Sequence, residues 1–83
     1  MKLLYFAWVK QKIGRGEEEL RLPAGVATIA ELVAFLRARG PGYAEAFGDP
    51  KRLRAARNQT HVNFEARIED VDEIAFFPPV TGG

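Results

Sequence analysis

One segment of the chain has a pattern that fits only an amphipathic helix, and it limits the folds that the chain can adopt. Four apolar residues recur at helical spacing and define one buried stripe: Ile29, Leu32, Val33 and Leu36. Thr28 and Glu31 have the spacing of a capping box, and Gly40 followed by Pro41 is a stop signal. Because a single apolar stripe must be buried against another element, the rest of the chain has to supply a sheet.

The remaining segments are typical of short β-strands separated by turn residues. Runs rich in β-branched and aromatic residues, or alternating between apolar and charged ones, predict five strands: 3–13, 19–22, 53–57, 61–64 and 73–77. Asn58-Gln59 is expected to form a turn, and 43–47 a short helical turn. The order β-β-α-β-β-β, with one main helix across one face of a mixed sheet, predicts an α+β fold of the ubiquitin-like β-grasp arrangement.

Length and composition restrict the chain to one small domain. Its 83 residues leave no room for a second, so we expect a domain over 1–77 and an extended tail over 78–83. Cysteine is absent, which excludes a disulfide framework, a thiolate metal site and a cysteine nucleophile. A fold that depends on packing alone suits a cytoplasmic protein.

Charge and hydropathy argue against two classes of partner. Twelve basic and eleven acidic residues give a net charge of +1, which is too balanced to indicate a nucleic-acid binder. No apolar run approaches the roughly 20 residues that span a bilayer. We therefore expect no nucleic acid and no membrane among the partners.

Both faces of the predicted sheet are apolar, although one helix can cover only one of them. We assign one parity set to the core beneath the helix: Leu3, Tyr5, Ile74 and Phe76. The other set is expected to form an exposed apolar patch: Leu4, Phe6, Trp8 and Phe77. Such a patch usually marks a partner surface, the alternative being that a loop or the segment 41–50 folds over it.

The chain ends Pro78-Pro79-Val80-Thr81-Gly82-Gly83. The prolines favour an extended exit from the domain, and glycines can lie in a narrow channel close to another active site. Fully extended, these residues span roughly 20 Å, although a frayed terminus is the plain alternative. A terminal carboxylate has to be activated, typically as a mixed anhydride with AMP, before it can accept sulfur or an amine.

The run 72–83 resembles the C-terminal signature of the small subunit of molybdopterin synthase (MoaD type), and the Asn58-Gln59 turn and the capped helix are similar too. The resemblance spans nearly the whole chain. It implies a sulfur carrier in molybdenum cofactor (molybdopterin) biosynthesis, in which Gly83, preceded by Gly82, is adenylated and becomes a thiocarboxylate. That group would give its sulfur to cyclic pyranopterin monophosphate.

The resemblance also implies partners. An E1-like adenylating enzyme (MoeB type) would use ATP and magnesium, while this chain binds no cofactor or metal itself. The tail would enter the large subunit of molybdopterin synthase (MoaE type), which holds the catalytic residues, in a heterotetramer of two small and two large subunits. Positions that match the family's contact surface, or that belong to the tail, are Phe6, His61, Phe77, Pro78, Pro79, Val80 and Thr81, and the parity pattern adds Trp8. His61 is expected at an interface or plain surface rather than in catalysis.

Three alternatives stay open. The chain could be a ubiquitin-like sulfur carrier for thiamine synthesis or tRNA thiolation, or a protein modifier that forms isopeptides through Gly83. It could also bind nucleic acid through a basic cluster formed by Lys51, Arg52, Arg54 and Arg57, with Arg67 nearby. A solvated loop is the usual explanation of such a cluster, and an acidic surface on the activating enzyme is another. Where the family has Asp-Gly-Asp, this chain has Asp70-Val71-Asp72, so a turn of a different type is expected because valine tolerates positive φ badly.

Overall fold

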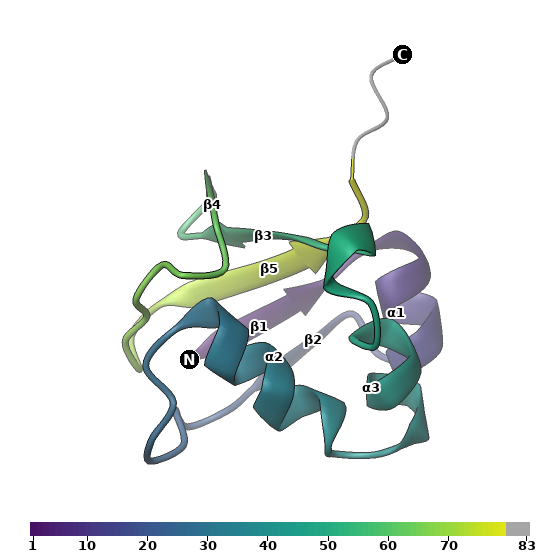
Figure 1. Cartoon of the computed structure of the whole chain (residues 1–83), viewed down its shortest axis with the longest axis horizontal. Coiled ribbons are helices and arrows are strands. Elements are labelled where there is room, and N and C mark those ends of the chain that lie inside the picture. The colour runs from purple at the N-terminus through teal and green to yellow at the C-terminus, as the bar shows by residue number, and fades with distance from the viewer. Residues whose placement is uncertain (80–83) are drawn as a thin grey trace.

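A computed structural model of the chain describes residues 1–79, and the last four residues lie outside the described part. Figure 1 shows helices packed on one side of a twisted sheet. The elements in chain order are β1 (Lys2–Tyr5), α1 (Ala7–Ile13), β2 (Glu17–Glu19), α2 (Ile29–Arg37), α3 (Pro41–Ala46), a 3₁₀ turn η1 (Pro50–Arg52), β3 (Arg54–Arg57), β4 (Thr60–Val62) and β5 (Glu73–Phe77). No helix in the described part is long and apolar enough to cross a membrane.

The five strands form one mixed sheet in the order β2-β1-β5-β3-β4. The first and last strands of the chain, β1 and β5, lie parallel at its centre, and every other pair is antiparallel. Helices α2 and α3 lie across one face (Figure 1). The predicted α+β fold with a mixed sheet and its main helix across one face is therefore confirmed.

The main helix forms as its sequence predicts, but it ends differently. Thr28 Oγ1 accepts a hydrogen bond from the Glu31 amide at 3.2 Å, and Glu31 Oε1 accepts one from the Thr28 amide at 3.1 Å. The prediction that Gly40 closes the helix is wrong. The last turn tightens instead, with the Ala38 amide bonded to the Phe35 carbonyl at 3.2 Å. Gly40 is the N-cap of α3, and Pro41 begins that helix.

The predicted strand 3–13 is wrong beyond Tyr5. The Phe6 amide makes the last bond to β5, at 3.1 Å to the Phe76 carbonyl, and Ala7 then adopts a φ of 55°. The chain turns there into α1, which places Val9 fully in the core. Helix α1 therefore replaces the last seven residues, 7–13, of the predicted strand, and it buries Val9 in the core.

The other strands differ from their predictions at the ends. β2 covers Glu17–Glu19 rather than 19–22, because Leu22 turns its amide to Asp70 Oδ1 at 2.6 Å. β4 covers Thr60–Val62 rather than 61–64, because the Phe64 carbonyl instead accepts from the Ala30 amide of α2 at 2.8 Å. The 53–57 and 73–77 strands are confirmed within one residue.

Two turns carry the residues that the sequence singled out. Asn58 and Gln59 have φ values of 50° and 72°, the left-handed conformation of a two-residue hairpin turn, so that turn is confirmed. Val71 does not adopt positive φ and is 87% exposed. The turn is held instead by Asp72, whose Oδ1 accepts from Asn58 Nδ2 at 3.0 Å and whose Oδ2 accepts from the Glu69 amide at 2.7 Å.

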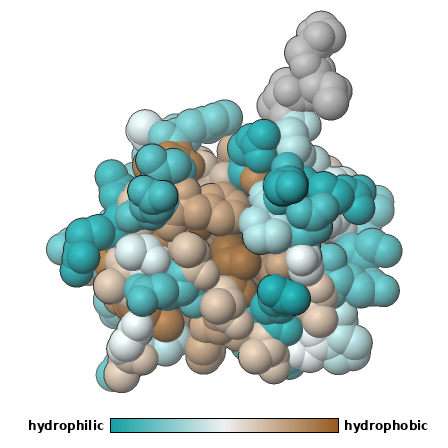
Figure 2. Space-filling view, in the orientation of Figure 1, coloured by the Kyte–Doolittle hydropathy of each residue, from teal (hydrophilic) through white to brown (hydrophobic). Residues whose placement is uncertain are grey.

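The parity assignment of the core is confirmed. The set Leu3, Tyr5, Ile74 and Phe76 is at most 1% exposed and packs under the helices. Phe47 stands edge-on to Phe76, with ring centroids 5.0 Å apart. On the helical side hydrophilic residues dominate the rim, and apolar surface gathers over the centre (Figure 2).

A carboxylate is built into one margin of this core. Glu18 Oε2 accepts from Tyr5 Oη at 2.8 Å and from Tyr43 Oη at 2.7 Å, and Glu18 Oε1 accepts from Arg39 Nη1 at 2.9 Å. Burial alone would raise the pKa of Glu18, but the hydrogen bonds from Tyr43, Tyr5 and Arg39 outweigh it and lower the pKa. Burial, reinforced by this carboxylate, raises the pKa of Tyr5 and of Tyr43. This cluster joins β1, β2, the end of α2 and α3.

Candidate functional site: the open face and the root of the tail

The face of the sheet opposite the helices, called the open face below, has an apolar centre. Strand register places Leu4 beside Ala75, Ala75 beside Ala56, and Ala56 beside His61. Paired residues point to the same side of a sheet, and the alternate residues Leu3, Ile74 and Ala55 point into the core. These four side chains therefore form one row across the open face.

The three residues matched to a contact surface come together on this face. Phe77 and His61 lie with ring centroids 5.0 Å apart. Phe6 follows β1 directly, and its amide bonds to the Phe76 carbonyl, so it lies at the same end of the sheet as Phe77. Phe6 is 49% exposed, and α3, which holds most of the segment 41–50, lies on the helical side of the sheet (Figure 1). Their role in binding stays a prediction.

Trp8 is the member of the predicted patch that lies on a helix. It lies on α1, where it is half-buried against the core. The guanidinium of Arg52 lies over its indole ring, 5.1 Å from the centroid. The strand parity that placed Trp8 beside Phe6 fails because the chain becomes helical at Ala7.

The chain leaves the domain at the end of β5, and this point, Phe77–Pro79, is called the root of the tail. In Figure 1 the yellow end of β5 rises directly beside the green coil of η1 and close to α1. Pro78 and Pro79 are half-buried and belong to no strand. Val80, Thr81, Gly82 and Gly83, which carry the rest of the predicted site, lie outside the described residues.

The predicted basic cluster is divided between two ends of the sheet. Arg54 is paired in register with Phe77, and Lys51 and Arg52 precede it on η1, so all three cations lie near the root of the tail. Arg57 lies three residues along β3, about 10 Å away, and its Nη1 donates to the Arg67 carbonyl at 2.6 Å. We call Lys51, Arg52 and Arg54 the cationic collar.

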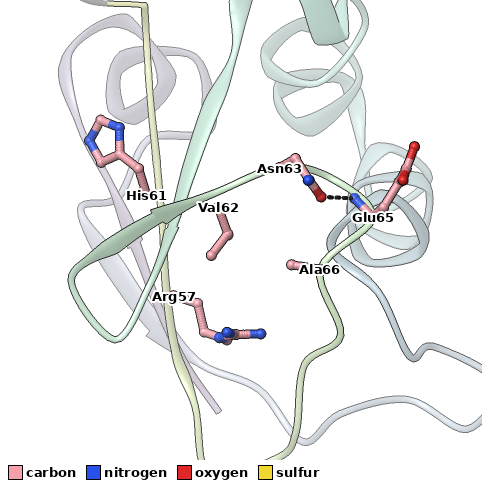
Figure 3. Close-up of a pocket in the computed structure, with 6 residues that line it drawn as sticks. All are labelled: Arg57, His61, Val62, Asn63, Glu65 and Ala66. Carbon is pink, nitrogen blue, oxygen red and sulfur yellow. Dashed lines mark hydrogen bonds between the residues drawn. The ribbon is translucent and has the colours of Figure 1, made fainter.

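A shallow hollow of about 530 Å³ lies under β4 and its following loop. Figure 3 shows Val62, Arg57 and Ala66 turned toward it, while His61 points to the other side of the strand. Two of its lining side chains are engaged within the chain: Arg57 donates to the Arg67 carbonyl, and Asn63 Oδ1 accepts from the Glu65 amide at 2.9 Å (Figure 3). Residues 1–79 contain no group of three or more potential metal ligands.

The sequence predicted the aromatic residues and the basic cluster of this surface, but not that three of the cations lie beside Phe77. Phe6 and Phe77 follow from strand parity, whereas Arg54 lies beside Phe77 only through the pairing of β3 with β5. Pairing the predicted strands 53–57 and 73–77 as antiparallel neighbours would have indicated that Arg54 lies beside Phe77.

Comparisons with known proteins cover the whole chain. The sequence model of a family described as the ThiS family matches residues 3–83. The chain is 42% identical over 83 residues to a protein of Escherichia coli (strain K12) named molybdopterin synthase sulfur carrier subunit, covering 100% of this chain and 99% of that protein.

Two solved structures share its fold. The crystal structure of SAMP1 from Haloferax volcanii superposes with a TM-score of 0.76 and 26% identity, covering 100% of this chain and 98% of that one. A putative molybdopterin converting factor, subunit 1, from Pyrococcus furiosus gives a TM-score of 0.74 and 30% identity, with 95% of each chain covered. The predicted ubiquitin-like β-grasp fold agrees with these neighbours.

Proposed function

The chain belongs to the ThiS family, and from that membership we propose that it is the sulfur carrier subunit of a molybdopterin synthase. The observation that carries the proposal is the full-length similarity to a curated protein of that name. Gly82 and Gly83 supply the pair of glycines that this role uses. In this role the chain works in molybdenum cofactor biosynthesis, in the cytoplasm.

The chemistry resides in the terminal carboxylate of Gly83. That carboxylate attacks the α-phosphate of ATP and releases pyrophosphate, which gives a glycyl adenylate. A sulfur nucleophile then displaces AMP and leaves a thiocarboxylate. ATP and magnesium belong to an E1-like adenylating enzyme of the MoeB type, and this chain itself binds no cofactor.

The acceptor step takes place in a partner. The tail 78–83 delivers its thiocarboxylate to the large subunit (MoaE type), where sulfur passes to cyclic pyranopterin monophosphate. Catalytic residues for that step belong to the large subunit, in a heterotetramer of two small and two large subunits. The open face, with Phe6, His61 and Phe77, supports this assembly because it presents apolar side chains beside the root of the tail.

Intact-mass spectrometry tests the carrier role. The full chain is incubated with ATP, magnesium, the cognate adenylating enzyme and a sulfur source. We expect a mass rise that matches replacement of one oxygen by sulfur, absent after deletion of Gly83. Addition of the large subunit and the pterin precursor should then return the original mass and yield the sulfurated pterin. A Gly83-deleted chain that still supports pterin sulfuration would contradict the proposal.

A second candidate rests on the structural similarity to SAMP1, an acronym expanded as small archaeal modifier protein 1. As a modifier the chain would join Gly83 to lysine amines as isopeptides. Immunoblots of cells that express a tagged chain separate the two functions. Abundant higher-mass conjugates that disappear when Gly83 is deleted would favour the modifier.

A further inference from the structure

The cationic collar is a charged surface without a counterpart in the described part of the chain. The neighbouring carboxylate of Asp49 is the cap of η1 and accepts from the Lys51 amide at 3.1 Å. No ion pair joins Lys51, Arg52 or Arg54 to a carboxylate within residues 1–79. The remaining positive charge is therefore open to a partner.

The collar is also held in place. Pro50 begins η1, the Asp49 cap fixes its first turn, and the Arg52 guanidinium rests over the Trp8 ring. Arg54 Nη1 donates to the Leu53 carbonyl at 2.9 Å and to the Lys51 carbonyl at 3.3 Å. Because these contacts restrain the side chains in advance, a partner that meets them loses less side-chain entropy.

The opposite corner of the open face has the other sign. Register places Glu17, Glu19 and Glu73 on the same side as Leu4 and Ala75, with Lys2 between them as the one cation. Lys2 Nζ lies 3.6 Å from Glu17 Oε2. The open face is therefore apolar at its centre, basic at the root of the tail and acidic at the far corner.

From this distribution we infer that the partner that receives the tail carries carboxylates around the entrance through which the tail passes, and that these carboxylates meet Lys51, Arg52 and Arg54. The inference rests on the proposed function, which supplies the partner: the large subunit of molybdopterin synthase. Opposite charges at this position steer the encounter, and like charges at the acidic corner disfavour the reversed orientation. The collar increases the association rate and sets the relative orientation of the two proteins, while Phe6 and Phe77 contribute the apolar contact.

Association kinetics between the full chain and the cognate large subunit test the inference. The collar variant carries Lys51→Glu and Arg54→Glu, and a control variant with the same change of charge carries Arg37→Glu and Arg67→Glu, remote from the open face. At low ionic strength we expect the collar variant to associate about tenfold more slowly and the control less than twofold. At high salt the three rates should converge, because the steering is screened.

Each outcome decides one question. Equal slowing of collar and control variants would overturn the inference, because it would show an effect of net charge alone. An unchanged association rate in the collar variant would also overturn the inference. So would RNA binding that the collar variant loses while its association with the large subunit stays unchanged. If the unaltered chain forms no complex with the large subunit, the proposed function itself fails. Urea unfolding of both variants checks that each remains folded.

Discussion

Arg39 and Arg52 lie over aromatic rings in nearly the same way, yet their surroundings differ in one respect. Arg39 is 4.8 Å from the centroid of Tyr43, and Arg52 is 5.1 Å from that of Trp8. Arg39 also donates to the carboxylate of Glu18 at 2.9 Å, whereas Arg52 has no carboxylate partner within residues 1–79. One cation belongs to a network closed inside the domain, and the other belongs to a surface left open.

The difference separates charges that stabilise this fold from charges that are available to a partner. Around Glu18 every donor has an acceptor, and the side chain is only 5% exposed. A buried carboxylate of this kind is tolerated because its hydrogen bonds offset its desolvation. The collar bears the same type of side chain in water, where charge costs little and contributes little to stability. Stability and binding should therefore respond to different substitutions.

The largest effect is expected from Glu18→Ala. Removal of the carboxylate leaves the buried hydroxyl of Tyr5 without its acceptor and Arg39 without its counter-ion, which should cost about 3 kcal/mol of the free energy of unfolding. Urea denaturation measures it. The neighbouring Glu17→Ala is the control, because Glu17 is exposed and its pair with Lys2 is worth under about 1 kcal/mol. Equal losses in the two variants would mean that the network is not closed as described.

The Glu18 network should make the stability of the fold depend on pH in both the acid and the alkaline range. Glu18 has a lowered pKa in the folded state, so its contribution is complete above the unfolded value of 4.5 and is lost as pH falls through the folded pKa. Tyr5 and Tyr43 have raised pKa values, so theirs is complete below the unfolded value of 10.0 and is lost as pH rises.

The alkaline loss is limited to about 1.4 kcal/mol per pH unit for each tyrosine. Denaturation midpoints measured from pH 2 to pH 11 test both arms. Glu18→Ala should abolish most of the loss of stability at low pH. It should only reduce the loss at high pH, because Tyr5 stays buried after the carboxylate is removed. An acid arm that persists unchanged in this variant would assign it to other carboxylates.

The open face should show the reverse behaviour. Phe6→Ala should weaken binding of the large subunit about tenfold, because exposed aromatic residues are typical anchors of an interface. Its effect on unfolding should stay near 1 kcal/mol, since half of the ring is already in water. Titration calorimetry measures the affinity. Val71→Ala is the control, an exposed apolar residue outside the open face, and a similar loss of affinity there would contradict the placement of the interface.

The parts of the fold that the sequence predicts well are those with local signals. Helix α2 is predicted by its capping box and apolar stripe, and β5 by a run of apolar and aromatic residues that ends at two prolines. Helix α1 was missed because its first residues continue the apolar run of β1. The run Lys10-Gln11-Lys12, poor in strand formers, was the available warning.

The site divides in the same way. The outward positions of Phe6 and Phe77 are each predicted from the alternation within their own predicted strand, which is a local property. The collar and the Glu18 network depend on pairings between distant segments: Arg54 meets Phe77 across 23 positions, and Tyr43 meets Glu18 across 25. No pattern within either segment fixes those pairings. Packing of the helices on the sheet decides them, so they become visible only in the folded chain.

The smallest effect sharpens the comparison between the two arginines. Arg52→Ala removes an exposed cation–π contact and should cost about 0.5 kcal/mol, whereas Arg39→Ala removes a similar contact together with a charged hydrogen bond and should cost about 2 kcal/mol. Since the two guanidinium–ring distances are similar and indole is the stronger cation–π partner, a larger cost for Arg39→Ala reports the carboxylate of Glu18. Trp8 is the only tryptophan, so its emission should shift in Arg52→Ala and stay unchanged in Arg39→Ala. Equal costs for the two arginines would show that the ring contacts, rather than the closed network, account for the stability at both places.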